Sequence, residues 1–300
     1  MSIYNYPLFI IKPIALLGRY FPKTMLQLRF YRKTGRKYDL KNPQKLQDYS
    51  IAKLFDPTTD LQQYAMFADK YGVRKYIKEK IGEQYLTRLY GVYKRAEDID
   101  FDALPDKFVL KTNNGCGNNI IVRNKSELNV KETRKKLNYW LHFPYGDLTG
   151  QTHYSLITPR IIAESLLEQD PKDKEALPRD YKFFCFKGKP YYVLYYEGRR
   201  PNGHITPNML FDMAWNPQPE AVLRPTDHAI PCPQSFELMT QLVTAIAQDI
   251  DFARIDFYEI AGKPIFGEIT LTPDIDTNIR PQFDKLIDLP AQYYRQINNM

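Results

Sequence analysis

Residues 252–273 constrain the fold more than any other part of the chain. In Phe-Ala-Arg-Ile-Asp-Phe-Tyr-Glu-Ile-Ala-Gly-Lys-Pro-Ile-Phe-Gly-Glu-Ile-Thr-Leu-Thr-Pro, two apolar stretches flank a turn at 261–263. An antiparallel hairpin with an odd loop, of about three or five residues, places Asp256 opposite Glu268 and Arg254 opposite Thr270. Because side chains alternate between the two faces of a strand, all four are expected on one face.

Asp256 and Glu268 form a candidate metal site. Two carboxylates directly opposed across strands repel each other by about 0.2–1 kcal/mol when exposed. A divalent cation reverses that repulsion, and oxygen ligands without cysteine or histidine select Mg²⁺ or Mn²⁺ over zinc. The alternative is a polar sheet face that Arg254 neutralises without a metal.

Residues 108–122 predict two strands joined by a loop rich in glycine and asparagine. The first strand ends in Lys111, and the loop contains Gly115 and Gly117. Glycine lets backbone N–H groups approach phosphate oxygens, and the lysine adds a mobile positive charge. The pattern indicates a phosphate-binding loop, and an ordinary hairpin with a loose turn is the alternative.

Residues 161–168, Ile-Ile-Ala-Glu-Ser-Leu-Leu-Glu, predict an apolar strand that ends in acidic residues before a polar loop. Such a segment can offer backbone groups to an adenine ring and a carboxylate to a ribose. The alternative is a strand that only leads the chain out of the core.

Helix and strand patterns are mixed along the rest of the chain, and antiparallel hairpins are prominent. The predicted fold class is therefore α+β. Asp60 is expected to cap a helix that runs through Ala68. Further helices are expected at 74–81, 125–141 and 236–249, a short strand and loop at 92–101, and further strands at 182–186 and 190–196.

Charge and cysteine content narrow the partners and the compartment. A formal net charge of +7 suits a protein that handles phosphates or acidic polymers. The three cysteines, Cys116, Cys185 and Cys232, are scattered along the chain, which argues against a disulfide framework and favours a reducing cytoplasm. The four histidines are dispersed as well, so the sequence argues against a zinc site.

Residues 1–41 combine many apolar side chains with nine basic residues and a single acid, Asp39. Two interpretations are open. A helical arm could pack its leucine, phenylalanine and tyrosine side chains on the body of the protein, or the arm could contact a membrane surface or a polyanion. The apolar stretch 6–18 is interrupted by Pro7, Lys12 and Pro13 and is too short to span a bilayer.

Taken in order, the three patterns resemble the ATP-grasp superfamily, in which a nucleotide lies between two α+β lobes. The resemblance implies that Lys111 contacts the α- and β-phosphates of ATP, and that Asp256 and Glu268 bridge Mg²⁺ to the phosphates. An earlier lysine of the family pattern matches Lys70. The resemblance implies further nucleotide contacts in the phosphate loop and at the strand end, from Asn114, Gly115, Cys116, Gly117, Glu164, Ser165, Leu166, Leu167 and Glu168.

More closely, the chain is similar to the teichuronopeptide-biosynthesis (TupA-like) type of ATP-grasp protein. The matching stretches are 69–74, 104–111, 180–190 and 266–273, and the resemblance extends from about residue 42 to the C-terminus. Thr270, the candidate third metal ligand, stands where most ATP-grasp enzymes have a metal-binding asparagine. Asp274 stands where a glycine is common, and Asn114 stands where the closer family commonly has histidine.

The residue patterns and the resemblance together predict a division into four segments. They are the N-terminal arm (1–41), a helical subdomain (42–100), a small nucleotide-binding lobe with the phosphate loop (101–170) and a C-terminal lobe with the Mg²⁺ site (171–300).

The implied function is that of an ATP-dependent carboxylate–amine ligase, which forms an amide through an acyl phosphate. Arg254, Lys111 and Lys182, together with Mg²⁺, are expected to stabilise negative charge on the transferring phosphoryl group. Lys182 is also a candidate for binding the phosphates of ATP. Arg199 and Arg200 are candidates for holding an anionic acceptor, and the alternative is that they are solvated loop arginines.

The implied substrates are an amine or amino acid and an anionic glycan or its precursor, with a uronic acid of a bacterial surface polysaccharide or capsule as the acceptor. The implied location is the cytoplasm, with peripheral contact at the inner face of the membrane through residues 1–41 as an extension. Two other classes stay open: a non-catalytic module that keeps the fold and binds polyanions or membrane surfaces, and a glycosyltransferase. No nucleic-acid-binding motif is recognisable.

Overall fold

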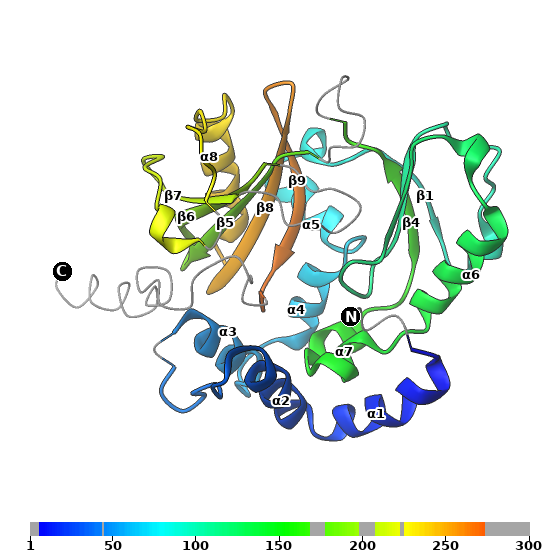
Figure 1. Ribbon diagram of the computed structural model, residues 1–300, viewed down its shortest axis with the longest axis horizontal. Coiled ribbons are helices and arrows are strands. Elements are labelled where there is room, and N and C mark those ends of the chain that lie inside the picture. Colours follow the sequence, from blue (N-terminus) through cyan, green and yellow to red (C-terminus); the bar gives the residue numbers. More distant parts are fainter. Residues whose placement is uncertain (1–5, 44, 169–177, 198–207, 223–224, 274–300) are drawn as a thin grey trace. The chain divides into compact units, whose positions relative to one another are not determined.

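The computed structural model describes residues 6–43, 45–168, 178–197, 208–222 and 225–273. Helices and two antiparallel sheets make up the described chain, which confirms the predicted α+β class (Figure 1). The chain divides into two compact units that are discontinuous in sequence. The first comprises Met1–Lys37, Pro57–Arg74 and Thr87–Leu166, and the second comprises Tyr38–Asp56, Lys75–Leu86 and Leu167–Met300. The division into four consecutive segments stays a prediction.

The first unit contains a four-stranded antiparallel sheet in the order β1-β4-β2-β3. Its strands are β1 (Leu89–Tyr93), β4 (Ile161–Ser165), β2 (Phe108–Thr112) and β3 (Asn119–Val122). Alternation along β2 buries Phe108 and Leu110 on one face and places Lys111 on the other. Val109 pairs with Glu164 of β4, so Glu164 lies on the same face as Lys111. The strands expected at 108–111 and 120–122 are thus confirmed.

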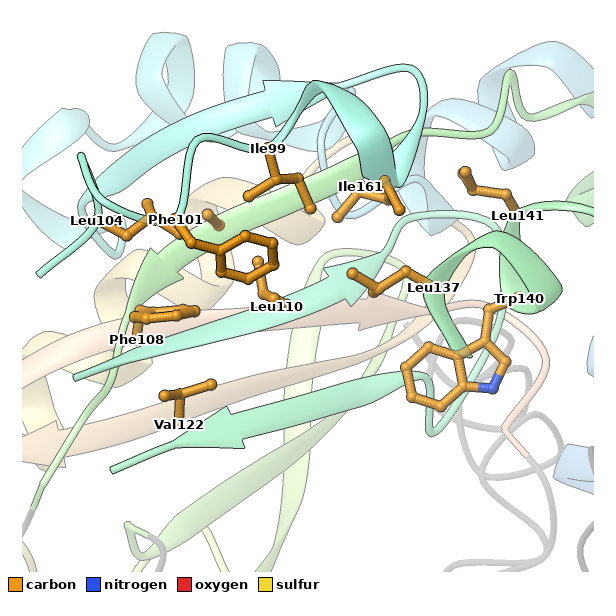
Figure 2. Close-up of a cluster of buried hydrophobic side chains, with 12 residues drawn as sticks. Ile99, Phe101, Leu104, Phe108, Leu110, Val122, Leu137, Trp140, Leu141 and Ile161 are labelled. Atoms are coloured by element: carbon orange, nitrogen blue, oxygen red, sulfur yellow. The ribbon is translucent and has the colours of Figure 1, made fainter. Parts of the chain in front are cut away.

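A hydrophobic cluster covers the apolar face of this sheet (Figure 2). Helix α6 (Val130–Leu141) contributes Leu137 and Trp140, which pack in one cluster with Phe108 and Leu110 of β2 and Ile161 of β4. Burial stabilises the fold by about 25 cal/mol per Å² of apolar surface removed from water. The cluster therefore anchors α6 to one side of the sheet, and Lys111 and Glu164 lie on the opposite face.

Two asparagine caps divide the helix that the sequence predicts at 125–141. The side chain of Asn124 accepts a hydrogen bond from the backbone N–H of Ser126 at 3.1 Å and begins the short 3₁₀ turn η4 (Lys125–Glu127). Asn129 accepts from the N–H of Glu132 at 3.0 Å and begins α6. Each cap accepts a hydrogen bond from a backbone N–H at the beginning of a helical segment. The region therefore contains two helical segments instead of the single expected helix. The prediction of one continuous helix was wrong.

The other helical segments of the first unit are α1 (Leu8–Tyr20), α2 (Pro22–Thr34), α4 (Leu61–Ala68), η3 (Ala96–Asp98), α7 (Tyr145–Thr149) and η5 (Thr152–Leu156). Asp60 caps α4 as predicted, because its Oδ1 accepts from the N–H groups of Gln62 at 2.9 Å and Gln63 at 3.1 Å. Helix α5 (Val73–Lys80) contains the boundary between the two units. Within the described ranges, every helix falls short of the length and apolar character needed to cross a membrane.

The second unit contains a five-stranded antiparallel sheet in the order β7-β6-β5-β8-β9. Its strands are β7 (Asn208–Asp212), β6 (Lys189–Tyr196), β5 (Asp180–Phe186), β8 (Phe252–Ile260) and β9 (Lys263–Thr270), and its helical segments are α3 (Leu46–Leu54), η2 (Glu83–Tyr85), η6 (Pro219–Ala221) and α8 (Phe236–Ala247). One face of the sheet is apolar and packs on α8, where the ring of Phe183 stacks on Phe236 with centroids 6.1 Å apart. The opposite face carries charged side chains of β5, β8 and β9.

The β8–β9 hairpin has the predicted residue pairs, but its turn differs from the expected one. The turn has two residues, Ala261 and Gly262, both with positive φ (50° and 72°), and Ile260 pairs with Lys263. That turn alone would put Asp256 out of register with Glu268. A β-bulge at Gly267 adds one residue to β9 and restores the pairs Asp256↔Glu268 and Arg254↔Thr270. The expected pairs are confirmed, and the expected odd-length turn was wrong.

Candidate functional site

A row of charged side chains crosses the second unit's sheet on its polar face. Lys182 of β5 pairs with Asp256 of β8, which pairs with Glu268 of β9. Two positions along, Arg254 pairs with Thr270 on the same face. Strand alternation therefore brings together five of the residues that the sequence analysis assigns to catalysis and metal binding.

Asp256 lies at the centre of this group. Arg254 holds it with two parallel hydrogen bonds, from Nε to Oδ1 at 2.8 Å and from Nη2 to Oδ2 at 2.7 Å. The Nζ of Lys182 lies 2.5 Å from Asp256 Oδ2 and 2.7 Å from Asp180 Oδ2. Asp256 is only 2% exposed, and burial alone would raise the pKa of its carboxyl. The charges and hydrogen bonds of Arg254 and Lys182 outweigh burial and lower that pKa below its ordinary value.

Arg254 connects the two predicted metal ligands. Its Nη2 lies 2.8 Å from Glu268 Oε1 as well as 2.7 Å from Asp256 Oδ2, so both carboxylates converge on one cationic atom. The same Nη2 lies 3.1 Å from Thr270 Oγ1, and that hydroxyl donates to Glu268 Oε1 at 3.2 Å. Thr270 thus orients both Arg254 and Glu268 through its single oxygen. Burial would lower the pKa of Arg254, but the charge of Asp256 raises it instead.

The donor set fits a magnesium ion that nucleotide phosphates help to bind. Among the residues with described positions, no three Asp, Glu, His or Cys side chains group closely enough to hold a metal by themselves. Mg²⁺ is usually held by one or two carboxylates plus substrate phosphates, and the converging oxygens of Asp256 and Glu268 supply that number.

A second group of charges lies on the first unit's sheet. The Nζ of Lys111 lies 2.5 Å from Glu164 Oε2, and Arg74 Nη1 lies 2.9 Å from Glu164 Oε1. Arg74 also donates to the backbone oxygen of Thr87 at 2.6 Å. Glu164 is 3% exposed, so this nearly buried carboxylate positions two cations. With two cations on one acid, the group favours an anionic ligand.

Arg74 is the member of this group that the site predictions omit. It belongs to the matching stretch 69–74, but its contact partner Glu164 is 90 residues away in the chain. The pairing of the two becomes visible only once the start of α5 lies beside β4. Glu164 itself was expected among the nucleotide contacts; the structure places its two oxygens on Lys111 and Arg74, and the nucleotide contact stays a prediction.

The predicted phosphate loop is held at its base and exposed at its tip. Asn113 donates to Asp69 Oδ1 at 2.8 Å and to the Thr158 carbonyl at 3.1 Å, and it accepts from the N–H of Arg160 at 2.7 Å. Cys116 at the tip is exposed, and Gly117 has a φ of 76° with open space around it. A well-anchored base with an open glycine tip is suited to receiving a phosphate group.

The structure brings Lys70 to this loop. Its Nζ donates to the backbone oxygen of Gly115, so two residues predicted separately from the family pattern lie together. Asn114 is buried, with its Nδ2 3.4 Å from the Leu141 carbonyl. The roles of these residues in nucleotide binding stay predictions.

The strand end at 165–168 coincides with the division between the units. β4 ends at Ser165, whose N–H donates to the Arg88 carbonyl at 2.9 Å. Leu166 is the last residue of one unit and Leu167 the first residue of the next segment, and Glu168 is exposed. The predicted substrate residues Arg199 and Arg200, and the departure at Asp274, lie outside the described residues.

A protein-family model described as TupA-like ATPgrasp matches residues 47–289 of the chain. A search of curated proteins found no significant match.

Solved structures with similar folds include three ligases. The D-alanine–D-alanine ligase of Bacillus anthracis is 15% identical with a TM-score of 0.46, and the match covers 79% of this chain and 64% of that one. The L-amino acid ligase of Bacillus licheniformis is 12% identical with a TM-score of 0.45, covering 75% and 47%. The phosphoribosylamine–glycine ligase of Thermotoga maritima is 11% identical with a TM-score of 0.41, covering 69% and 48%. The chain thus spans between about half and two thirds of the length of these proteins.

Proposed function

The chain belongs to the TupA-like ATP-grasp family, and on that premise we propose that it is an ATP- and Mg²⁺-dependent carboxylate–amine ligase. The observation that carries the proposal is the contact of Arg254 with both Asp256 and Glu268, beside Lys182 on the same sheet face. This arrangement can neutralise a phosphoryl group and the metal-bound phosphates of a nucleotide at one place.

The proposed reaction has two steps. A carboxylate oxygen of the first substrate attacks the γ-phosphorus of ATP, which forms an acyl phosphate and releases ADP. The nitrogen of an amine then attacks the acyl carbon, loses its proton to solvent or a base, and displaces inorganic phosphate, which leaves an amide. Lys182 and Arg254 stabilise the transferring group by their positive charge, and positioning supplies most of the remaining rate enhancement.

In the first unit, Lys111 and Lys70 bind the phosphates of ATP in this proposal. Lys111 is held by Glu164, which together with Arg74 fixes the direction of the lysine side chain. Lys70 already meets a backbone oxygen of the phosphate loop, so a phosphate that enters the loop finds a cation beside the glycines. The segment from Glu164 through Ser165, Leu166 and Leu167 to Glu168 is the proposed adenine and ribose contact.

Asp256 and Glu268 are the proposed Mg²⁺ ligands, and Thr270 keeps Glu268 oriented. A bound Mg²⁺ supplies neutralisation of the phosphate charge and orients the phosphates. Asp256 and Glu268 would hold the ion through the oxygens that face Arg254 Nη2 in this structure.

The finer assignment is that the enzyme joins an amino acid to a uronic acid of a surface polysaccharide or its precursor. The family to which the chain belongs and the net charge of +7 support an anionic glycan acceptor. Arg199 and Arg200 are the proposed acceptor ligands. The cytoplasm, which supplies ATP and keeps the three cysteines reduced, is the proposed compartment.

The test is nucleotide turnover with a panel of carboxylates and amines. The purified chain is incubated with Mg²⁺·ATP, single amino acids, and oligomers of uronic acids, and ADP and phosphate are measured. ADP release that requires one carboxylate, with hydroxylamine trapping a hydroxamate of that carboxylate, supports the proposal. AMP and pyrophosphate as products would show adenylation, and binding of the glycan without any turnover would show a non-catalytic module.

A further inference from the structure

Helices α1 and α2 expose an unusual number of large apolar side chains. Phe9 is 76% exposed, Tyr20 72%, Phe21 61% and Leu17 60%. We use the term N-terminal apolar face for the exposed apolar residues of α1 and the residue after it, which are Phe9, Ile10, Ile14, Leu16, Leu17, Tyr20 and Phe21. A contiguous apolar surface of this kind marks a site of interaction, whereas single exposed hydrophobic residues do not.

Close backbone packing fixes the rotation of α1 about its own axis, so its apolar exposed side cannot turn inward. Ile11, Ala15 and Gly18 are the buried residues of α1. A Cβ atom added at Gly18 would lie 2.0 Å from the backbone oxygen of Asp147 in α7, so the two helix backbones approach closely there (Figure 1). At 100° per residue, Phe9, Leu16 and Tyr20 lie on the side of α1 opposite these three positions.

The start and the end of this helical pair are also held. The Tyr139 hydroxyl of α6 donates to the Tyr6 carbonyl at 2.6 Å just before α1. Arg29 of α2 donates to the Thr149 carbonyl at 3.2 Å, and Leu26 and Phe30 of α2 are buried. The apolar face is therefore presented by a fixed pair of helices.

The charged side chains of α1 and α2 themselves all have one sign. Residues 1–38 contain no aspartate or glutamate. Lys12 and Arg19 are exposed and lie seven residues apart, which puts them together along one edge of the apolar face, and Lys23 and Arg32 of α2 are exposed as well. Lysine and arginine beside an apolar helix face are the composition of helices that lie in a membrane interface.

Helix α1 is too short to cross a bilayer. Its 13 residues extend about 20 Å, whereas the hydrocarbon core of a bilayer is about 30 Å thick. Tyr6, Tyr20 and Tyr31 are all exposed around the same two helices, and tyrosine concentrates at the level of lipid headgroups.

We infer that the N-terminal apolar face docks onto the surface of a lipid bilayer that contains anionic lipids. Apolar side chains of α1 enter the headgroup boundary, and Lys12, Arg19, Lys23 and Arg32 contact lipid phosphates. The charge decides between this occupant and a second copy of the chain. A two-fold dimer built on the same face would bring two wholly basic segments together, whereas an anionic surface neutralises them.

The test is flotation with vesicles of phosphatidylcholine alone and of phosphatidylcholine mixed with phosphatidylglycerol, without nucleotide. The chain is expected to float with the mixed vesicles and to lose binding as salt is raised. A double substitution of the apolar face, Phe9→Glu with Leu16→Glu, should lower the partition coefficient more than tenfold. Replacing Lys12 and Arg19 by glutamine should lower it about fivefold per charge on mixed vesicles.

The matched control is Leu238→Glu, at an exposed leucine of α8 outside these two helices, and it should bind like the wild type. Unfolding curves and circular dichroism check that each variant is folded. Absence of wild-type binding to mixed vesicles would overturn the inference. So would a wild-type dimer in light scattering that the Phe9 and Leu16 substitutions convert to monomer, since the face would then be a self-association surface. Because no ATP is used, the outcome is independent of the ligase proposal.

Discussion

Arg254 and Asp256 stand two residues apart on β8, and the guanidinium of the first holds both oxygens of the second, at 2.8 Å and 2.7 Å. A same-strand pair of this kind presents a rigid, buried carboxylate whose direction is set before any ligand arrives. Lys182 on the neighbouring strand closes the other side of Asp256. In the proposed function, metal binding, phosphate binding and the stability of the second unit all depend on this group.

Asp256→Asn is expected to abolish Mg²⁺-dependent binding of ATP and to destabilise the second unit. Removal of one partner from a buried ionic group costs about 3–5 kcal/mol, because Arg254 and Lys182 then lack their shared counter-ion. Calorimetric titration with Mg²⁺·ATP and urea unfolding measure the two effects. The control is Asp249→Asn, which removes a partly exposed ion pair with Lys80 and should change unfolding by less than about 1 kcal/mol.

Glu268→Gln is expected to separate metal binding from stability. The side chain is 37% exposed, so its loss should cost about 1 kcal/mol or less in unfolding free energy. The concentration of Mg²⁺ needed for half-maximal ADP release should nevertheless rise at least tenfold. An unchanged Mg²⁺ requirement in a folded Glu268→Gln variant would remove this residue from the metal site.

Lys111→Met is expected to eliminate measurable ATP affinity while the fold persists. The lysine side chain is 25% exposed at the edge of a strand, and its partner Glu164 keeps Arg74 as a second cation. Fluorescent-nucleotide titration measures the affinity. Lys135→Met, at an exposed position of α6, should bind ATP normally, and near-normal binding by Lys111→Met would contradict the phosphate role.

The residue pairing in the β8–β9 hairpin could be predicted from the sequence, but the turn and the bulge that produce it could not. Alternation along two strands is enough to place Asp256, Glu268, Arg254 and Thr270 on one face, because a strand has a period of two residues. The two-residue turn and the bulge at Gly267 offset each other, and no local pattern distinguishes that combination from a three-residue turn. The predicted register is therefore correct, although the predicted turn length is wrong.

Contacts between distant segments set the limit in the first unit. Lys70 and Lys111 lie in motifs that resemble those of the family, but the ion pair of Arg74 with Glu164 joins positions 90 residues apart.

The division of the 125–141 helix depends on which asparagine side chain caps a backbone N–H, and both Asn124 and Asn129 are suitable cap residues. Capping propensity identifies both asparagines as suitable caps, but it does not determine whether one or both of them begin a helical segment in the folded chain.

Gly267→Ala tests the bulge directly. A Cβ atom there would lie 3.0 Å from the backbone oxygen of Asp256 and 3.2 Å from Cε2 of Tyr258, so the strands must shift beside the proposed metal ligands. Crowding of this kind costs about 1–3 kcal/mol. The variant is expected to be less stable and to need more Mg²⁺ for ADP release. Wild-type stability together with a wild-type Mg²⁺ requirement would show that the bulge does not position the carboxylates.

The buried side chain of His153 is expected to make the free energy of unfolding fall in mild acid. The side chain is almost fully buried, and burial lowers its pKa to about 3. The unfolded chain takes up a proton below about pH 6.5 and the folded chain does not, so protonation favours unfolding as the pH falls from 6.5 toward 3. The loss reaches about 2 kcal/mol at pH 5. Urea unfolding between pH 7 and pH 5 measures it, and His153→Phe should remove this part of the pH dependence.

The most direct test of the ligase account follows an oxygen atom. The carboxylate substrate that supports ADP release is labelled with ¹⁸O in both carboxyl oxygens, and the inorganic phosphate formed with Mg²⁺·ATP and the amine is analysed by mass spectrometry. If an acyl phosphate forms, its bridging oxygen comes from the carboxylate and leaves with phosphate, so each phosphate released should contain one ¹⁸O atom. Unlabelled phosphate, or label recovered in AMP, would contradict this mechanism.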